Sequence, residues 1–112
     1  MANIPSEIKQ FLKEYINEIR KNFPVERVIL FGSYAKDRAN PDSDIDLAVF
    51  SNFFYKKNPV DVTTLLLSKA RKFHVNVEVF GFTNKDYDET NGNDFVKKIK
   101  REGIEVYAKT AI

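Results

Sequence analysis

The stretch of residues 28–50 constrains the fold of this chain most, because two apolar runs flank a glycine turn and a polar loop. Residues 28–31 are short, apolar and β-prone, which predicts a strand buried on both faces. Residues 44–50 alternate acidic or small residues with branched apolar ones, which predicts a second strand. We therefore expect a sheet in which one strand carries carboxylates on one of its two faces.

Apolar spacing predicts the other elements. We expect a first helix between Pro5 and Pro24, and a left-handed helix terminus at Gly103. The remaining predictions are a strand over 25–31, a helix over 60–72, a strand over 75–80, a break and cap at Asn91-Gly92-Asn93, a short helix over 95–99 and a strand over 104–108. This order predicts an α/β sandwich with a small mixed sheet and helices packed mainly on one face.

The composition excludes several classes of protein. A chain of 112 residues predicts a single domain over 1–112. The sequence lacks a membrane-length apolar run and signal-peptide features, so we expect an untargeted, cytoplasmic protein without membrane contact. With no Cys and only His74, zinc fingers and cysteine enzymes are excluded. The net charge of +2 argues against direct nucleic-acid binding.

Two sequence features carry chemistry. Gly32-Ser33 follows a buried strand and precedes a helical turn, where backbone N–H groups and a hydroxyl can hold phosphate oxygens. Asp44 and Asp46 project from one face of their strand and can share hard cations. Glu78 lies on another predicted strand, on the face opposite its valines. If the two strands are neighbours, the three carboxylates converge, as a site with two Mg²⁺ ions requires.

Residues 32–47 closely resemble the signature of the DNA polymerase beta-like nucleotidyltransferase superfamily, in which Gly-Ser is followed about ten residues later by Ser-Asp-Ile-Asp-Leu. Within it the chain is similar to minimal nucleotidyltransferases, which act in many prokaryotes as antitoxins beside a HEPN-domain ribonuclease toxin. The resemblance extends to the first helix, the strand with Glu78 and residues 95–104. It implies a polymerase beta palm-like fold and Mg²⁺-dependent transfer of a nucleoside monophosphate, typically AMP from ATP, to a hydroxyl group.

The resemblance also implies roles for individual residues. Gly32 and Ser33 would bind the nucleotide phosphates, and Asp44 and Asp46 would ligate magnesium as catalytic residues. Glu78 would be the third metal ligand and a candidate general base.

Other charged residues leave alternatives open. Lys36 and Arg38 are candidate nucleotide-binding residues, although basic side chains in a polar loop are as often simply solvated. Asp61 is the rival third carboxylate, but a place in the first turn of a helix favours a capping or dipole role. The family often has Gly where Asp37 stands, and often has Asp where Glu78 stands. The basic residues of 97–101 are interpreted as a solvated helix face.

Three functions compete at this stage. The first is a protein adenylyltransferase that modifies a partner HEPN toxin, with a homodimer or an aminoglycoside-type small acceptor as variants of the enzyme. The second is an antitoxin of the same fold that acts by contact alone. The third and weakest is a small nucleic-acid-binding domain. The cluster Phe53-Phe54-Tyr55 is a candidate partner surface or nucleobase shelf, and a buried satellite cluster is an equal alternative.

Overall fold

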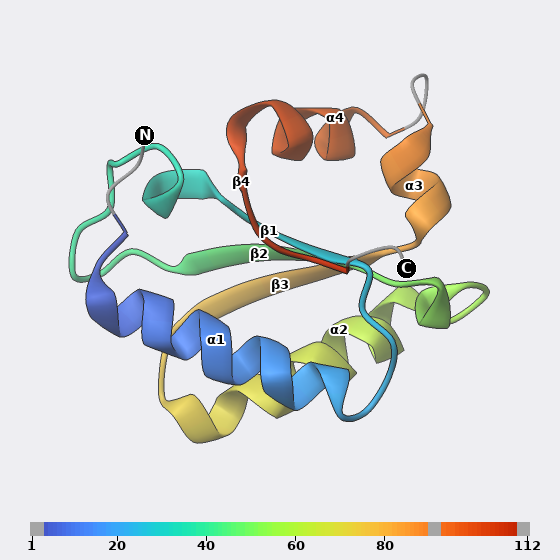
Figure 1. Ribbon diagram of the computed structural model, residues 1–112, viewed down its shortest axis with the longest axis horizontal. Helices are drawn as coiled ribbons and strands as arrows, with labels where there is room; N and C mark the ends of the chain where they lie inside the picture. The colour runs from blue at the N-terminus through green and yellow to red at the C-terminus, as the bar shows by residue number, and fades with distance from the viewer. Residues whose placement is uncertain (1–3, 90–92, 110–112) are drawn as a thin grey trace.

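The chain forms a four-stranded mixed sheet with helices on both faces (Figure 1). The structure is a computed structural model that describes residues 4–89 and 93–109. No helix within these ranges is both long and apolar enough to span a bilayer. The elements are α1 (Ser6–Arg20), β1 (Arg27–Phe31), the 3₁₀ turn η1 (Gly32–Tyr34), β2 (Ile45–Phe50), the 3₁₀ turn η2 (Asn52–Phe54), α2 (Pro59–Ala70), the 3₁₀ turn η3 (Arg71–Phe73), β3 (Val77–Phe82), α3 (Asn84–Asp88), α4 (Asp94–Glu102) and β4 (Ile104–Ala108).

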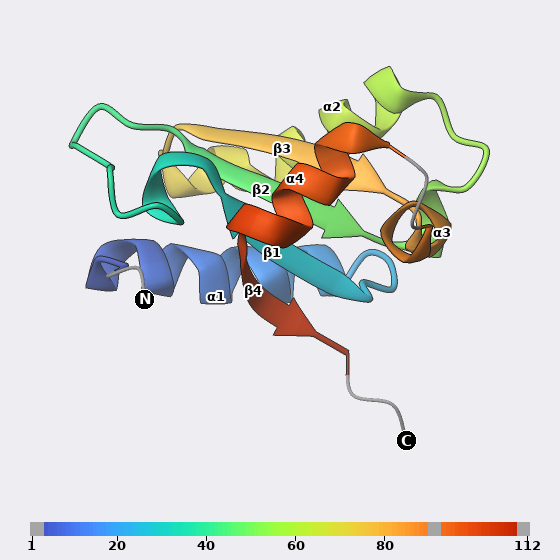
Figure 2. The ribbon, with the colours of Figure 1, turned by 90° about the horizontal axis from the view of Figure 1, so that it is seen from above.

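The strands lie in the order β3-β2-β1-β4, which Figure 2 shows from above. β1 runs antiparallel to both β2 and β4, whereas β2 and β3 are parallel and are joined through α2. A parallel pair needs such a crossover, because a tight hairpin can join only antiparallel strands. All four predicted strands are present, with their ends displaced by at most two residues, and the predicted mixed α/β architecture is confirmed.

The two longest helices, α1 and α2, cover one face of the sheet (Figure 1). Pro5 precedes the first turn of α1, where its missing N–H costs no hydrogen bond. The apolar stripe of α1 is buried as the spacing predicts, and the hydroxyl of Tyr15 donates a hydrogen bond of 2.8 Å to the Leu66 carbonyl oxygen of α2. Burial raises the pKa of Tyr15, so this hydroxyl stays protonated and ties the two helices together.

The opposite face carries α3 and α4 (Figure 2). Val96 and Ile99 of α4 pack there on a second core cluster that contains Ala48 and Phe50. Helix α3 was not among the predicted elements, although the sequence carries a signal for it. Thr83 and Asp86 form a capping box, in which each side chain accepts a hydrogen bond from the other residue's backbone N–H.

The end of α4 differs from the sequence prediction. Gly103 has φ −86° rather than a left-handed conformation, so the prediction of a left-handed terminus is wrong. The glycine is needed for space: a Cβ there would overlap Ile29 and lie 2.5 Å from the Ile99 carbonyl oxygen. At the start of α4 the predicted cap is confirmed for Asn93, whose side chain accepts hydrogen bonds from two backbone N–H groups. Asn91 and Gly92 lie outside the described residues.

Substitution of Gly103 tests this packing. Gly103→Ala is expected to lower the free energy of unfolding by about 1–3 kcal/mol, because the added methyl group overpacks the junction of α4 and β1. Asp37→Gly is the control, because Asp37 has φ +58°, where glycine is unstrained. We expect it to change stability by less than about 0.5 kcal/mol. Urea denaturation measures both, and equal stability of Gly103→Ala and the wild type would contradict the close approach.

Candidate functional site

The parallel pairing of β2 and β3 places Asp46 directly opposite Glu78. On its other side Asp46 pairs with Phe31 of β1. Along β2, Ile45 and Leu47 point into the core under α1 and α2, so the alternation of the strand turns Asp46 to the face that carries α4. The condition set by the sequence, that the two acid-bearing strands be neighbours, is met.

Asp46 lies within electrostatic reach of Glu78 and Asp44. Burial of Asp46, then the charge of Glu78, hydrogen bonding to Glu78 and the charge of Asp44, raise the pKa of Asp46 to about 6. Asp46 is half-buried, whereas Asp44 and Glu78 are exposed. The site therefore concentrates negative charge around one partly desolvated carboxylate.

The chemistry of these donors fits a hard divalent cation, which prefers carboxylate oxygens. Within the described ranges, however, no group of three or more His, Cys, Asp or Glu side chains is already drawn together as an ion site. The exposed side chains of Asp44 and Glu78 keep the rotamer freedom needed to approach an ion. The assignment of Asp44, Asp46 and Glu78 as metal ligands stays a prediction.

Gly32 lies against the Asp46 carboxylate. Its φ of +73° is in the left-handed region that favours glycine. A Cβ at this position would overlap Oδ2 of Asp46, so the turn and the carboxylate occupy adjoining space only because residue 32 has no side chain. This close approach joins the predicted phosphate-binding turn to the predicted metal ligands.

Ser33 belongs to the 3₁₀ turn η1, whose first N–H groups have no acceptor inside the turn. The turn is closed by hydrogen bonds from the backbone N–H groups of Ala35 and Lys36 to the Gly32 carbonyl oxygen. Lys36 lies beside this turn and forms an ion pair of 2.5 Å with Glu102 of α4. Arg38 is exposed in the following loop. The structure thus brings Lys36, but not Arg38, into a defined contact near Gly32.

The rival residues lie elsewhere. Asp61 is in the first turn of α2, on the helix layer that covers the other face, as its capping or dipole interpretation expects. The cluster of Phe53, Phe54 and Tyr55 follows the far end of β2, so it cannot serve as a nucleobase shelf for the acids at the start of that strand. The cluster is neither wholly buried nor wholly exposed, because Phe54 is buried while Tyr55 is exposed.

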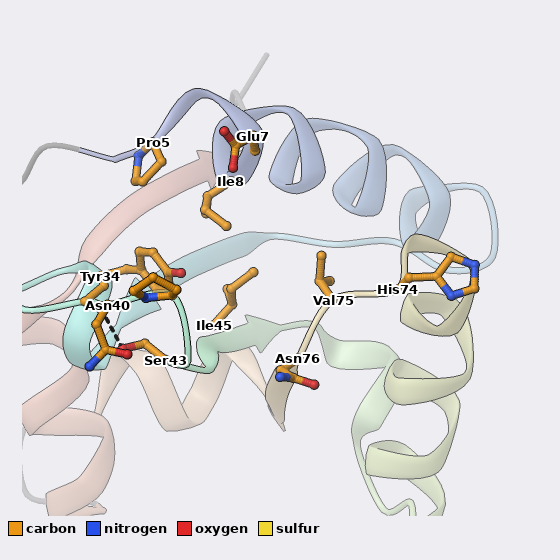
Figure 3. A pocket seen from close by; sticks show the side chains of 12 residues that line it. Pro5, Glu7, Ile8, Tyr34, Asn40, Ser43, Ile45, His74, Val75 and Asn76 are labelled. Atoms are coloured by element: carbon orange, nitrogen blue, oxygen red, sulfur yellow. Dashed lines mark hydrogen bonds between the residues drawn. The ribbon is translucent and has the colours of Figure 1, made fainter.

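A cavity of about 570 Å³ lies beside η1, on the α1 side of the sheet, and is larger than the cavity that borders Gly32 (Figure 3). Ile8 of α1, Ile45 at the start of β2 and Val75 in the loop before β3 project into it, and Asn40 and Ser43 border it. None of the seven predicted site residues lines this cavity. We therefore place the candidate site on the face with Asp46 and not in the larger cavity.

The chain is similar over most of its length to proteins of one family. The family model described as nucleotidyltransferase domain matches residues 12–106. "Putative protein adenylyltransferase MJ1215" of Methanocaldococcus jannaschii is 32% identical over 75 residues, which cover 57% of this chain and 87% of that protein. "Protein adenylyltransferase MntA" of Thermococcus cleftensis is 40% identical over 43 residues, which cover 38% of this chain and only 43% of that protein.

Two solved structures share the fold. The crystal structure of a putative nucleotidyltransferase from Sulfolobus solfataricus matches with a TM-score of 0.67 and 22% identity, covering 97% of this chain and 93% of that chain. A crystal structure described as a toxin-antitoxin with AMP-PNP matches with a TM-score of 0.61 and 20% identity, covering 95% and 76%. At these identities the likeness establishes the fold alone.

Removal of the Asp46 carboxylate tests whether repulsion among the neighbouring acids destabilises the fold. In EDTA above pH 7, Asp46→Asn is expected to melt a few degrees higher than the wild type. The folded-state pKa of Asp46 is raised to about 6, so ionisation destabilises the fold as the pH rises from about 4 to 6, and the penalty persists above that. The difference in Tm should vanish near pH 4, where Asp46 is protonated.

Thermal scans with and without Mg²⁺ complete this test. Mg²⁺ should raise the Tm of the wild type more than that of Asp46→Asn, because it stabilises the state to which it binds. Asp61→Asn, at the rival acid, is the control and should respond to Mg²⁺ as the wild type does. If in EDTA Asp61→Asn melted at a higher temperature than the wild type and Asp46→Asn did not, the site would have to be moved to α2.

Proposed function

This chain belongs to the nucleotidyltransferase domain family, and from that premise we propose that it transfers AMP from ATP to a hydroxyl group of a partner protein. The observation that carries the proposal is the pairing of Asp46 with Glu78 beside the Gly32 turn. Two relatives bear the name protein adenylyltransferase, and one fold neighbour is a toxin-antitoxin with AMP-PNP. These names support, for this chain, an adenylyltransferase that acts as an antitoxin.

In this proposal Asp44, Asp46 and Glu78 hold two Mg²⁺ ions. When bound, such ions neutralise the triphosphate and favour attack at the α-phosphorus. The N–H groups of the Gly32-Ser33 turn and the Ser33 hydroxyl donate hydrogen bonds to phosphate oxygens. Lys36 adds a positive charge at the same place, at the expense of its ion pair with Glu102.

The transfer forms a bond between the acceptor oxygen and the α-phosphorus and breaks the bond from that phosphorus to the bridging oxygen, so pyrophosphate leaves. The acceptor hydroxyl proton goes to a carboxylate oxygen of Glu78. Glu78 suits this role because it is exposed on the edge strand β3, where an incoming hydroxyl can reach it. Asp46 is less accessible, because it is half-buried between Phe31 and Glu78.

The size of the site favours a macromolecular acceptor. The cavity that borders Gly32 has a volume of about 150 Å³, well below the roughly 300–1,000 Å³ of pockets that enclose drug-sized ligands. An aminoglycoside-type acceptor would need a second subunit to complete its pocket. We therefore propose that the acceptor is a tyrosine hydroxyl of a HEPN-domain toxin, which brings its own surface and is silenced by the added AMP in the cytoplasm.

Substitutions in the turn separate the two parts of the site. Gly32→Ala should reduce transfer at least 100-fold, because the methyl group displaces the Asp46 carboxylate. Its cost in stability should be only about 1–2 kcal/mol, the penalty for a left-handed alanine. Ser33→Ala removes one hydroxyl donor to a charged acceptor, worth about 1.5–3 kcal/mol, and should cost roughly 10- to 150-fold. Steady-state transfer assays with Tm controls measure both, and a fully active Gly32→Ala would contradict the proposed turn.

Intact-mass analysis tests the acceptor. The protein is co-expressed with the product of its neighbouring gene, which the proposal expects to be a HEPN-domain toxin. The toxin should gain mass in whole AMP units, and no gain should occur with Asp44→Asn, which removes one oxygen ligand. A tight complex with an unmodified toxin would favour the antitoxin that acts by contact alone.

A further inference from the structure

One side of α4 faces the Gly32 turn across the cavity of about 150 Å³. The α4 residues that line it have the helical spacing i, i+3, i+4 and i+7, so they form one stripe along the helix. They are Phe95, Lys98, Ile99 and Glu102. A cavity of this size lined by apolar side chains can hold a benzene-sized ring.

The first turn of α4 places one of the aromatic side chains, that of Phe95, in the wall of this cavity. The Asn93 side chain accepts a 2.8 Å hydrogen bond from the Phe95 N–H and so fixes that backbone. Phe95 nevertheless stays 37% exposed. Its ring lies nearly perpendicular to those of Phe31 and Phe80, with ring centroids 5.6 Å and 5.1 Å apart. Phe31 is the register partner of Asp46, so this aromatic cluster begins beside the candidate catalytic carboxylates.

The other end of the same cavity is charged. Lys36 pairs with Glu102 there, and Lys98 lies on the same stripe of α4. Among the residues that line the cavity, two cations face one carboxylate, and the carboxylates around Asp46 lie beside this end of it. The lining therefore carries the aromatic side chains of Phe31 and Phe95 at one end of the α4 stripe and charged side chains toward the other end.

We propose that this cavity is the nucleobase site, in which the base of the nucleoside triphosphate stacks on Phe95. A planar base followed by an anionic phosphate chain matches the order of aromatic and cationic side chains along the cavity. The inference rests on the proposed function, since it places another part of the same substrate. It replaces the cluster of Phe53, Phe54 and Tyr55 as the nucleobase shelf.

The lining also determines how the base is read. The polar side chains among the seven lining residues are those of Lys36, Lys98 and Glu102, which the proposal places at the phosphate end, so the base is held by stacking. Stacking tolerates every base, because each has a π face. ATP and GTP should therefore bind with affinities within about tenfold of each other.

Calorimetry with two ligands tests the site. The α,β-methylene analogue of ATP carries base and phosphates, whereas inorganic tripolyphosphate carries the phosphate chain alone, and both are titrated with Mg²⁺ present. Phe95→Ala should weaken binding of the analogue about 5- to 150-fold, the range measured for one base–aromatic stack. Binding of tripolyphosphate should change less than twofold, and Phe95→Trp should restore binding of the analogue.

Phe53→Ala is the matched control, because Phe53 is 39% exposed and also packs on another ring, that of Phe23. It should leave both affinities unchanged. If Phe95→Ala weakens both ligands equally, or neither, the nucleobase assignment is overturned. If Phe95→Ala bound the ATP analogue as the wild type does but no longer transferred AMP, the Phe95 ring would be assigned to binding of the acceptor instead. A wild type that binds neither ligand overturns the nucleotide site as a whole, and the proposed function with it.

Discussion

The register of β2 against β3 is the constraint on which the site depends. It sets Asp46 opposite Glu78, and a slip of one residue would turn Glu78 toward the layer of α1 and α2. The valines of β3 resist such a slip, because Val79 is buried in the core under those helices. The positions of the acids are therefore determined by packing on the opposite face of the sheet, together with the parallel crossover through α2.

The Asp46 carboxylate is held near those of Glu78 and Asp44 against their repulsion. The raised pKa of Asp46 shows that the folded chain disfavours the ionised form before any cation arrives. Gly32 contributes to the same arrangement, since its left-handed backbone leaves room for the Asp46 oxygen. Keeping these carboxylates close together before a cation binds lowers the stability of the fold. The main core, where side chains such as Leu30 and Leu47 are fully buried, must offset that loss.

Much of this arrangement could be predicted from the sequence, because alternation and helical spacing are local signals. The faces of Asp46 and Glu78 followed from alternation, but their adjacency required the strand order. Other features depend on contacts between distant residues. Gly103 was misassigned because glycine serves both left-handed turns and close approaches, and only Ile29 from another strand distinguishes the two. Phe95 was predicted only as an apolar residue of a short helix, because its partners, Phe31 and Phe80, are distant in sequence.

The role of α4 explains why this small sheet has helices on both faces. Val96 and Ile99 bind the helix to the second core cluster, while Phe95 and Lys98 remain at the edge that faces the Gly32 turn. One amphipathic helix thus closes the core and forms a wall of the site. Because the proposed site pairs Asp46 of β2 with Glu78 of the edge strand β3, the proposed acceptor would approach from that edge of the sheet. A large partner surface meets that geometry without any further residues from this chain.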